Sequence, residues 1–198
     1  MEAVMGVLLG IGLGAACGFR IFVPLLVASI AIHGGFLTVT PEFAWLGGTP
    51  ALITLSIATL LEIAGYYLPV IDNTLDVLGA PAAVIAGTIL AAGFIGHMDP
   101  MLQWGLAAIA GGGAAGVIHG GRAAIRAAAS ATTGGLGNSA VSTAETVSAS
   151  LVSILACVLP VLAVLLLGAA IYLLVRFAIS LKRKLAQAGT PDKVEVQD

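Results

Sequence analysis

Residues 4–25 read VMGVLLGIGLGAACGFRIFVPL, an apolar run in which every fourth residue from Gly6 to Gly18 is a glycine. Residues four apart lie on one face of an α-helix, so these glycines form a smooth groove where another backbone can approach closely. Arg20 and Pro24 follow the last glycine of the stripe. The stretch therefore predicts a tightly packed membrane helix that bends or divides into two pieces near Arg20.

The pattern recurs in the second half of the chain as Gly112, Gly116, Gly120 and Arg122. Each copy is followed by a glutamate beside apolar sequence, Glu62 in the first half and Glu145 in the second. With one helix between them, the copies would cross a bilayer in opposite directions, as in transporters that bind their solute between inverted repeats. We predict a single transmembrane domain over 1–177, with repeat one at 4–76, a linking helix at 80–97 and repeat two at 100–177.

Composition indicates that the lipid bilayer is the solvent of this domain. Hydrophobic residues make up 59% of the 198 residues and charged residues 9%, against roughly 25% charged in soluble domains. Apolar runs of spanning length predict an all-α polytopic helical bundle with five membrane segments, at 4–32, 50–70, 80–97, 100–126 and 145–177. The stretch 127–144 is uncharged but rich in small polar residues, and is expected to form a surface loop or a re-entrant segment.

Three sequence signals mark helix starts. Thr49-Pro50 and Asp99-Pro100 each place a capping residue before a proline, which is favoured in the first turn of a helix. Ser142-Thr143-Ala144-Glu145 matches a capping box, in which the hydroxyl and the carboxylate bind free N–H groups of the first turn.

Charged residues within apolar helices are the candidate functional groups. Glu62 stands near the middle of the segment 50–70, where an ionised side chain costs roughly 3 kcal/mol. Arg20 would lie at similar depth in the preceding segment, so we predict an Arg20–Glu62 pair, either a structural lock or part of a proton or ion site. Arg122 and Glu145 would form the matching pair in the second half, although the capping box alone could explain Glu145.

Asp72 and Asp76 would share one helical face, because they are four residues apart. Pro69 breaks the preceding helix, and the carbonyls exposed at that break could join the two carboxylates around a cation. Alternatively, Asp72 caps a short helix in a solvated loop. Asn138 and Ser142 are candidates only because they are near Glu145 in the sequence.

Several functions are excluded or unsupported. The three histidines have no ligand spacing, and nothing in the sequence names a metal. No nucleophile elbow, zinc-protease motif, phosphate loop or cysteine cluster occurs, so neither a cofactor nor an enzyme activity is expected. The basic residues form a short tail rather than a patch, which argues against nucleic-acid binding. Cys17 and Cys157 are expected to be packing groups.

The sequence resembles the DUF4126 family of small bacterial integral membrane proteins. The resemblance lies in Gly18-Phe19-Arg20-x-Phe22-x-Pro24-Leu25, in Glu62 with Pro69-x-x-Asp72-x-x-x-Asp76 and Pro81, and in Gly135-Leu136-Gly137-Asn138 with Ser142 and Glu145. One departure is Gly65-Tyr66-Tyr67, where the family has a polar run. The function of that family is unknown, so the resemblance implies a membrane location and an architecture but no activity.

The leading hypothesis is a small transporter or channel of the bacterial inner membrane for a cation or a proton-coupled small solute. Its site would lie between the repeats and contain Arg20, Glu62, Asp72, Asp76, Arg122, Asn138, Ser142 and Glu145. The basic tail, 178–198, should be cytoplasmic, and the glycine faces could also pack in a homodimer. The alternatives are a non-transporting scaffold or lipid-binding protein, and an intramembrane enzyme that acts on a lipid head group.

Overall fold

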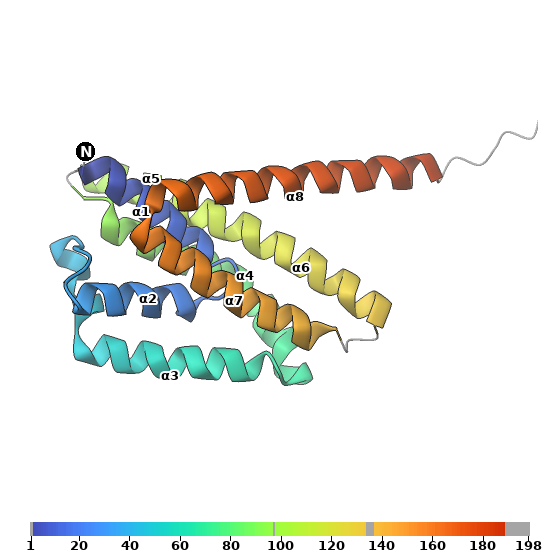
Figure 1. Cartoon of the computed structure of the whole chain (residues 1–198), viewed down its shortest axis with the longest axis horizontal. Coiled ribbons are helices and arrows are strands. Elements are labelled where there is room, and N and C mark those ends of the chain that lie inside the picture. Colours follow the sequence, from blue (N-terminus) through green and yellow to red (C-terminus); the bar gives the residue numbers. More distant parts are fainter. Residues whose placement is uncertain (1, 97, 134–136, 189–198) are drawn as a thin grey trace, which may run out of the picture.

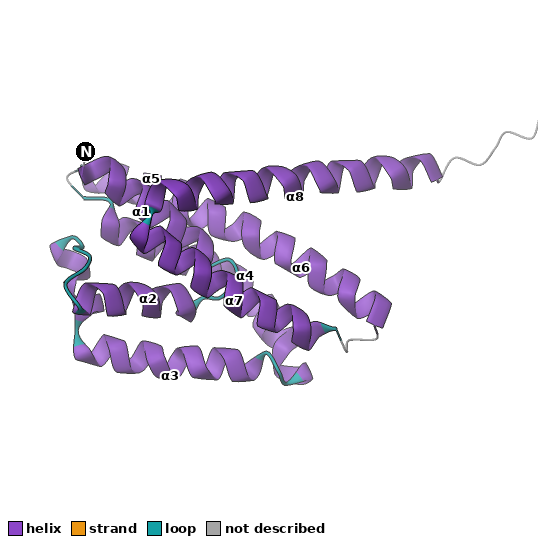
Figure 2. Ribbon diagram, viewed as in Figure 1, coloured by secondary structure: helices purple, strands orange, loops and turns teal. Residues whose placement is uncertain are grey.

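The computed structural model describes residues 2–96, 98–133 and 137–188, which form helices without any strand (Figures 1 and 2). In chain order the elements are α1 (Glu2–Ala16), α2 (Phe22–His33), η1 (Pro41–Gly47), α3 (Thr49–Gly65), α4 (Pro69–Phe94), α5 (Pro100–Ala107), η2 (Ala108–Gly112), α6 (Gly113–Thr133), α7 (Asn138–Val158) and α8 (Pro160–Ala188). The predicted all-α fold is confirmed. Residues 189–198 of the predicted tail lie outside the described residues, and α8 continues past the predicted boundary at 177.

Three stretches of the described chain are helical, long and apolar enough to cross a membrane: Leu75–Phe94, Pro100–Thr132 and Asn138–Val158. A fourth span results if η1 and α3, which meet at 62°, are counted together. The chain therefore has the helices of a membrane protein, but they are not divided into the five predicted segments.

The predicted first segment is instead a helical hairpin. α1 and α2 have 15 and 12 residues, which at a rise of 1.5 Å per residue gives lengths of about 22 and 18 Å. Both are shorter than the roughly 30 Å hydrocarbon core of a bilayer. In Figure 1, α1 runs from the left edge to the centre and α2 returns to the left edge. The chain thus divides between Ala16 and Phe22, one of the two outcomes expected near Arg20, and also reverses direction there.

The glycine stripe of α1 is buried inside the chain. A Cβ on Gly14 would lie 2.8 Å from the Cα of Gly111 and 3.0 Å from the carbonyl oxygen of Gly87. Three backbones, from α1, α4 and η2, therefore meet at glycines. This stripe cannot also form the predicted homodimer contact, because α4, η2 and α6 already cover it.

The two glycine-rich helices run in the same direction, which contradicts the predicted inverted repeat. Gly14 meets Gly111 of η2, and Gly18 meets Ala115 of α6, so residue numbers increase in the same direction along the two contacting segments. α1 and α6 are therefore parallel, and both run from left to right in Figure 1. The prediction failed because it counted one helix between the copies, whereas the hairpin adds a further reversal.

Residues 127–144 are mostly helical, contrary to the predicted loop or re-entrant segment. α6 continues to Thr133 and α7 begins at Asn138, and residues 134–136 lie outside the described residues. The small polar side chains fit a helix because their hydroxyls bond carbonyls of the same helix, as Thr132 does with Ala128 at 2.9 Å and Thr143 with Ser139 at 2.9 Å.

The predicted segment 145–177 is also two helices, because α7 ends at Val158 and α8 begins at Pro160. Leu159 has φ −137° and ψ 70°, outside the helical region, as is usual for a residue that precedes proline. In Figure 1, α7 runs to the left and α8 returns to the right.

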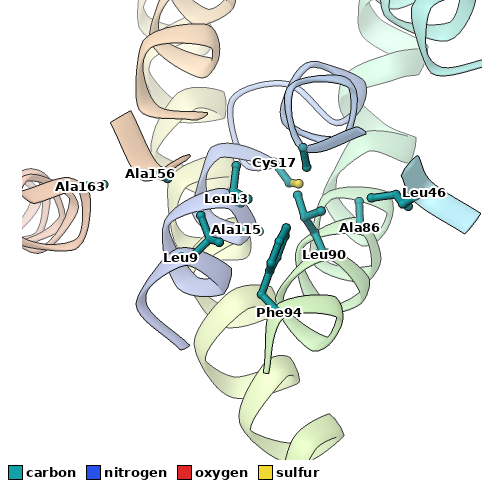
Figure 3. Packing of buried hydrophobic residues seen from close by; sticks show 11 residues of the cluster. Leu9, Leu13, Cys17, Leu46, Ala86, Leu90, Phe94, Ala115, Ala156 and Ala163 are labelled. Carbon is teal, nitrogen blue, oxygen red and sulfur yellow. The ribbon is translucent and has the colours of Figure 1, made fainter. Parts of the chain in front are cut away.

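Small and branched apolar side chains fill the space between these helices. Figure 3 shows Leu13 of α1 and Cys17, which follows α1, near Leu90 and Phe94 of α4. Cys17 is 1% exposed, which confirms its predicted packing role. The Asp99 cap is also confirmed, since its carboxylate accepts the N–H of Met101 at 2.9 Å, whereas α3 starts after Gly48 without a side-chain cap.

Candidate functional site

Arg20 lies in the turn of the α1–α2 hairpin and is completely buried. Its Nη2 donates to the carbonyl oxygen of Ser142 at 2.9 Å and to the Ser142 hydroxyl at 2.5 Å. Its Nε donates to the Thr146 hydroxyl at 3.1 Å, and Nη2 lies 3.5 Å from Oε2 of Glu145. The hairpin turn is thereby fastened to the first half of α7.

Two side chains form hydrogen bonds with backbone groups at the hairpin turn. The Glu62 carboxylate accepts the N–H groups of Ile21 at 2.7 Å and Phe22 at 3.0 Å. Arg122 donates to the carbonyl oxygen of Phe19 at 2.7 Å. A negative group thus binds the N-terminus of α2 and a positive group binds the chain beyond α1, which is the arrangement that backbone dipoles favour.

Three guanidinium groups surround one tyrosine ring. The Cζ atom of Arg20 lies 3.8 Å from the centroid of the Tyr66 ring, and those of Arg122 and Arg126 lie 5.0 Å from it. Arg122 also donates to the Tyr66 hydroxyl at 3.0 Å. Cations within about 6 Å of a ring centroid are attracted to the ring quadrupole, so Tyr66 helps to hold like charges together.

Two further carboxylates bind the arginines. Asp76 hydrogen bonds to Arg122 and lies 3.4 Å from Nε of Arg126. Glu145 lies 3.5 Å from a nitrogen of each of the three arginines. We call this set the charge cluster: Arg20, Glu62, Tyr66, Asp76, Arg122, Arg126 and Glu145.

The carboxylates of the charge cluster have different partners. Its three carboxylates match its three guanidinium groups in number, but Glu62 is bound to two backbone N–H groups of α2. Among the described side chains, Asp76 and Glu145 are then shared by three guanidinium groups. These two carboxylates therefore help to hold the three guanidinium groups around Tyr66.

The family model for a domain of unknown function, DUF4126, matches residues 7–180. The chain belongs to the DUF4126 family. No curated protein and no solved structure matches the chain. The DUF4126 match covers every residue of the charge cluster, and it confirms the family resemblance without supplying an activity.

The DUF4126 chain brings most of the predicted site residues together, but with different partners. Arg122 and Glu145 pair as predicted, at 3.5 Å between Nε and Oε1. Arg20 and Glu62 are neighbours without the predicted direct pairing, because Glu62 binds backbone N–H groups and Arg20 binds α7. Arg122 and Arg126 are both buried, at 5% and 3% exposed.

Two predicted arrangements at the start of α7 are wrong. Ser142 and Glu145 do not form a capping box, because α7 begins earlier, at Asn138. Ser142 instead accepts a hydrogen bond from Arg20. Asn138 lies outside the charge cluster and hydrogen bonds to Ser130 of α6 at 3.0 Å.

The predicted cation site between Asp72 and Asp76 receives no support. Both residues belong to α4, as their spacing requires, but the Asp72 side chain lies outside the described part of the structure. Asp76 is bound by Arg122 and Arg126. In the described part of the chain, no group of three or more potential ligands could hold a metal ion.

The sequence interpretation missed Tyr66 and Arg126 as site residues. Tyr66 belongs to the Gly65-Tyr66-Tyr67 stretch where the sequence departs from the family pattern, yet its side chain is 4% exposed and contacts all three arginines. The spacing of Arg122 and Arg126, four residues apart on α6, was the available signal, because it places both on one helical face.

A cavity of about 230 Å³ borders the charge cluster at Arg122 and Glu145, between α6, α7 and α8. A larger cavity, of about 800 Å³, lies at the opposite end of α1 and is lined by residues that include Met5, Thr40 and Pro160. Of these two cavities, the smaller one contacts described residues of the charge cluster and is therefore relevant to the chemistry of the site.

Proposed function

We propose that this DUF4126 protein is a small membrane transporter or channel that moves a proton-coupled small solute past the charge cluster. The observation that carries the proposal is the position of Glu145, 3.5 Å from a nitrogen of Arg20, of Arg122 and of Arg126. One carboxylate can therefore exchange among three cationic partners with little movement. Ionisable groups inside membrane helices are costly and commonly mark ion or proton pathways.

The charges favour a proton-coupled anion over a bare cation. Three guanidinium groups would repel a metal cation at the cluster, and Asp76 and Glu145 are already paired with them. Protonation of Glu145 would remove one negative charge from beside three guanidinium groups, and the change in local charge would attract an anion. Proton and anion binding would then reinforce each other, which is the coupling that a symporter needs.

The test is proton movement in proteoliposomes containing trapped pyranine, with inward gradients of chloride, phosphate or lactate. We expect proton uptake with at least one of these anions, and at least a tenfold loss in Glu145→Gln. The matched control is Glu42→Gln, which changes an exposed acid of η1. Uptake equal to that of protein-free vesicles under all three gradients would contradict the proposal, as would equal rates for the two variants.

A non-transporting scaffold or lipid-binding protein is the second candidate. Glu62 and Arg122 bind the two backbone ends of the hairpin, as a purely structural lock would. A scaffold predicts a permanently dry cluster, whereas a transporter must admit water during its cycle. Ser148 borders the cavity beside Glu145, so Ser148→Cys in a chain lacking native cysteines should react with a charged, water-soluble thiol reagent only if the protein transports.

The proposal includes a location in the bacterial inner membrane with a cytoplasmic C-terminus. Support comes from the basic residues of 176–184 at the end of the last helix. We propose transport rather than catalysis because the sequence carries no recognised nucleophile motif. A homodimer remains a prediction, which now requires a surface other than the buried α1 stripe.

A further inference from the structure

His119 is a buried titratable group that lies beside the charge cluster. It belongs to α6, within the span Pro100–Thr132, and is 5% exposed. Residues three apart share one face of a helix, so the imidazole lies on the face that brings Arg122 into the cluster. Ionisable side chains inside membrane helices are costly and commonly belong to proton pathways.

The ring of His119 packs against α4 at a glycine. A Cβ on Gly79 would lie 3.0 Å from Cε1 of His119, 3.8 Å from its Nε2 and 3.7 Å from the hydroxyl oxygen of Tyr66. The imidazole and the Tyr66 hydroxyl therefore border the same space above Gly79. Alanine at position 79 would press on the ring, so the glycine allows the two polar groups to lie close together.

The neighbours of the ring connect it to the charge cluster. The imidazole donates a hydrogen bond to the backbone of Asp76 on α4, and the Asp76 carboxylate is bound by Arg122. Arg122 also donates to the Tyr66 hydroxyl at 3.0 Å. Among the described residues, the charged and titratable groups next to His119 are thus Asp76 from α4, Arg122 from α6 and Tyr66 from the turn after α3.

A proton on His119 would change the charge at this point of the site. In a neutral imidazole one nitrogen carries the hydrogen and the other carries a lone pair, which can accept a proton. The resulting imidazolium would be attracted by the Asp76 carboxylate and repelled by Arg122, so it would compete with Arg122 for Asp76. Histidine is also the side chain that ordinarily changes its charge between about pH 5 and 8.

We propose that His119 is a second proton-binding group of the site, and that its charge acts on the cluster through Asp76 and Tyr66. The inference rests on the proposed function, because it adds to Glu145 a group that takes up a proton when an anion is transported. A proton on His119 adds positive charge beside Arg122, which favours entry of the anion and reinforces the proposed coupling. A histidine with a packing role alone would stay neutral in dry surroundings.

Nuclear magnetic resonance of the full chain in phosphatidylcholine nanodiscs tests the proposal without requiring transport. The other histidines and tyrosines are replaced, by His33→Gln, His97→Gln, Tyr67→Phe and Tyr172→Phe. The labelled imidazole of His119 and the labelled Cζ of Tyr66 then give one set of signals each. Between pH 5 and 8, we expect the imidazolium to become neutral imidazole and the Tyr66 signal to shift with the same midpoint. One ring form throughout, or a Tyr66 signal that does not follow the ring, would overturn the proposal.

Two variants separate the charge of the ring from its packing. His119→Gln should reduce the pH-dependent shift of the Tyr66 signal at least fivefold, and an undiminished shift would refute the connection. Gly79→Ala keeps the imidazole but presses on it, so it should reduce the same shift at least twofold. Gly120→Ala is the matched control, because a Cβ on Gly120, next to His119 in α6, meets no atom within 4 Å, and it should behave as the parent chain.

The proton-uptake assay adds a transport readout. The ratio of the uptake rates at pH 5.5 and 7.5 should differ at least threefold between the wild type and His119→Gln. It should be unchanged in His33→Gln, since His33 is exposed and its Nδ1 lies 2.8 Å from the carbonyl oxygen of Gly47. An equal ratio in His119→Gln and the wild type would contradict the role of His119 in coupling.

Failure of this inference and failure of the proposed function give different results. Joint titration of His119 and Tyr66 without proton uptake under any gradient would refute transport and leave the proton-binding group established. Proton uptake without any titration of His119 would refute the inference and leave transport through Glu145 established.

Discussion

The junction of Gly14, Gly87 and Gly111 gives a sharp stability prediction. In Gly14→Ala, the new Cβ would lie 2.8 Å from the Cα of Gly111 and 3.0 Å from the carbonyl oxygen of Gly87. Both contacts are to backbone, so no side chain can rotate away and the helices must separate. Overpacking of this kind costs typically about 1–3 kcal/mol, and the double backbone contact places Gly14→Ala near the upper value.

The intrinsic helix preference of alanine over glycine offsets about 1 kcal/mol of this cost. The net destabilisation of Gly14→Ala should therefore be about 2 kcal/mol, equivalent to a melting temperature lower by about 4–8 °C for a chain of this length. Melting can be followed in detergent as the loss of the monodisperse peak in fluorescence-detected size-exclusion chromatography after heating.

Gly168→Ala is the control for the propensity effect. Gly168 lies in α8, and a Cβ there meets no atom within 4 Å. This variant should melt at or above the wild-type temperature. If Gly14→Ala is as stable as Gly168→Ala, the three backbones do not meet at glycines and the packing argument is wrong.

The remaining predictions concern the charge cluster and use the same melting assay. Arg20→Met should lower the free energy of unfolding by about 3–5 kcal/mol, because it leaves the buried Glu145 carboxylate short of a cation; a loss below 1 kcal/mol would contradict the burial of this pair. Glu62→Gln should cost about 1.5–3 kcal/mol, since a carboxamide oxygen cannot replace both charged acceptors of Ile21 and Phe22, and wild-type stability would show that this cap is absent. Tyr66→Leu should be less stable than Tyr66→Phe, because phenylalanine keeps the ring that three guanidinium groups contact; equal melting of the two variants would exclude a cation–ring contribution.

The sequence was sufficient to identify much of the candidate site, because an ionisable group in an apolar helix must find a partner. This reasoning selected Arg20, Glu62, Arg122 and Glu145, and all four meet in the charge cluster. It could not assign partners. The N–H groups of Ile21 and Phe22 need a side-chain acceptor, which Glu62 supplies, only because the helix is interrupted and the chain reverses at this point. Tyr66 was missed for a related reason, since a tyrosine gives no charge signal.

The fold was less predictable at its breaks than along its helices. Hydropathy describes how apolar a segment is and does not show whether the chain continues or turns back, so 4–32 and 145–177 were each predicted as one segment. At 127–144 the error was the opposite one: the small polar residues predicted a loop or re-entrant segment where most of the chain is helical. A hydroxyl can be satisfied by its own helix, as that of Thr132 is, so polarity alone does not indicate a loop in this composition.

The long sequence separations at the hairpin turn constrain how the nascent chain can be assembled. Arg20 binds Ser142, 122 residues later, and the carbonyl oxygen of Phe19 is bound by Arg122, 103 residues later. At the usual rate of synthesis, about 5–20 residues per second, the turn waits roughly 10 s for these groups. Before α6 and α7 emerge, Arg20 lacks its hydrogen-bond partners on α7 and the carbonyl oxygen of Phe19 lacks Arg122, which favours keeping the hairpin in the insertion machinery or at the water interface. The first residues to be synthesised are then among the last to enter their final place, and a ribosome that stalls before α6 would leave a product that quality-control proteases can recognise.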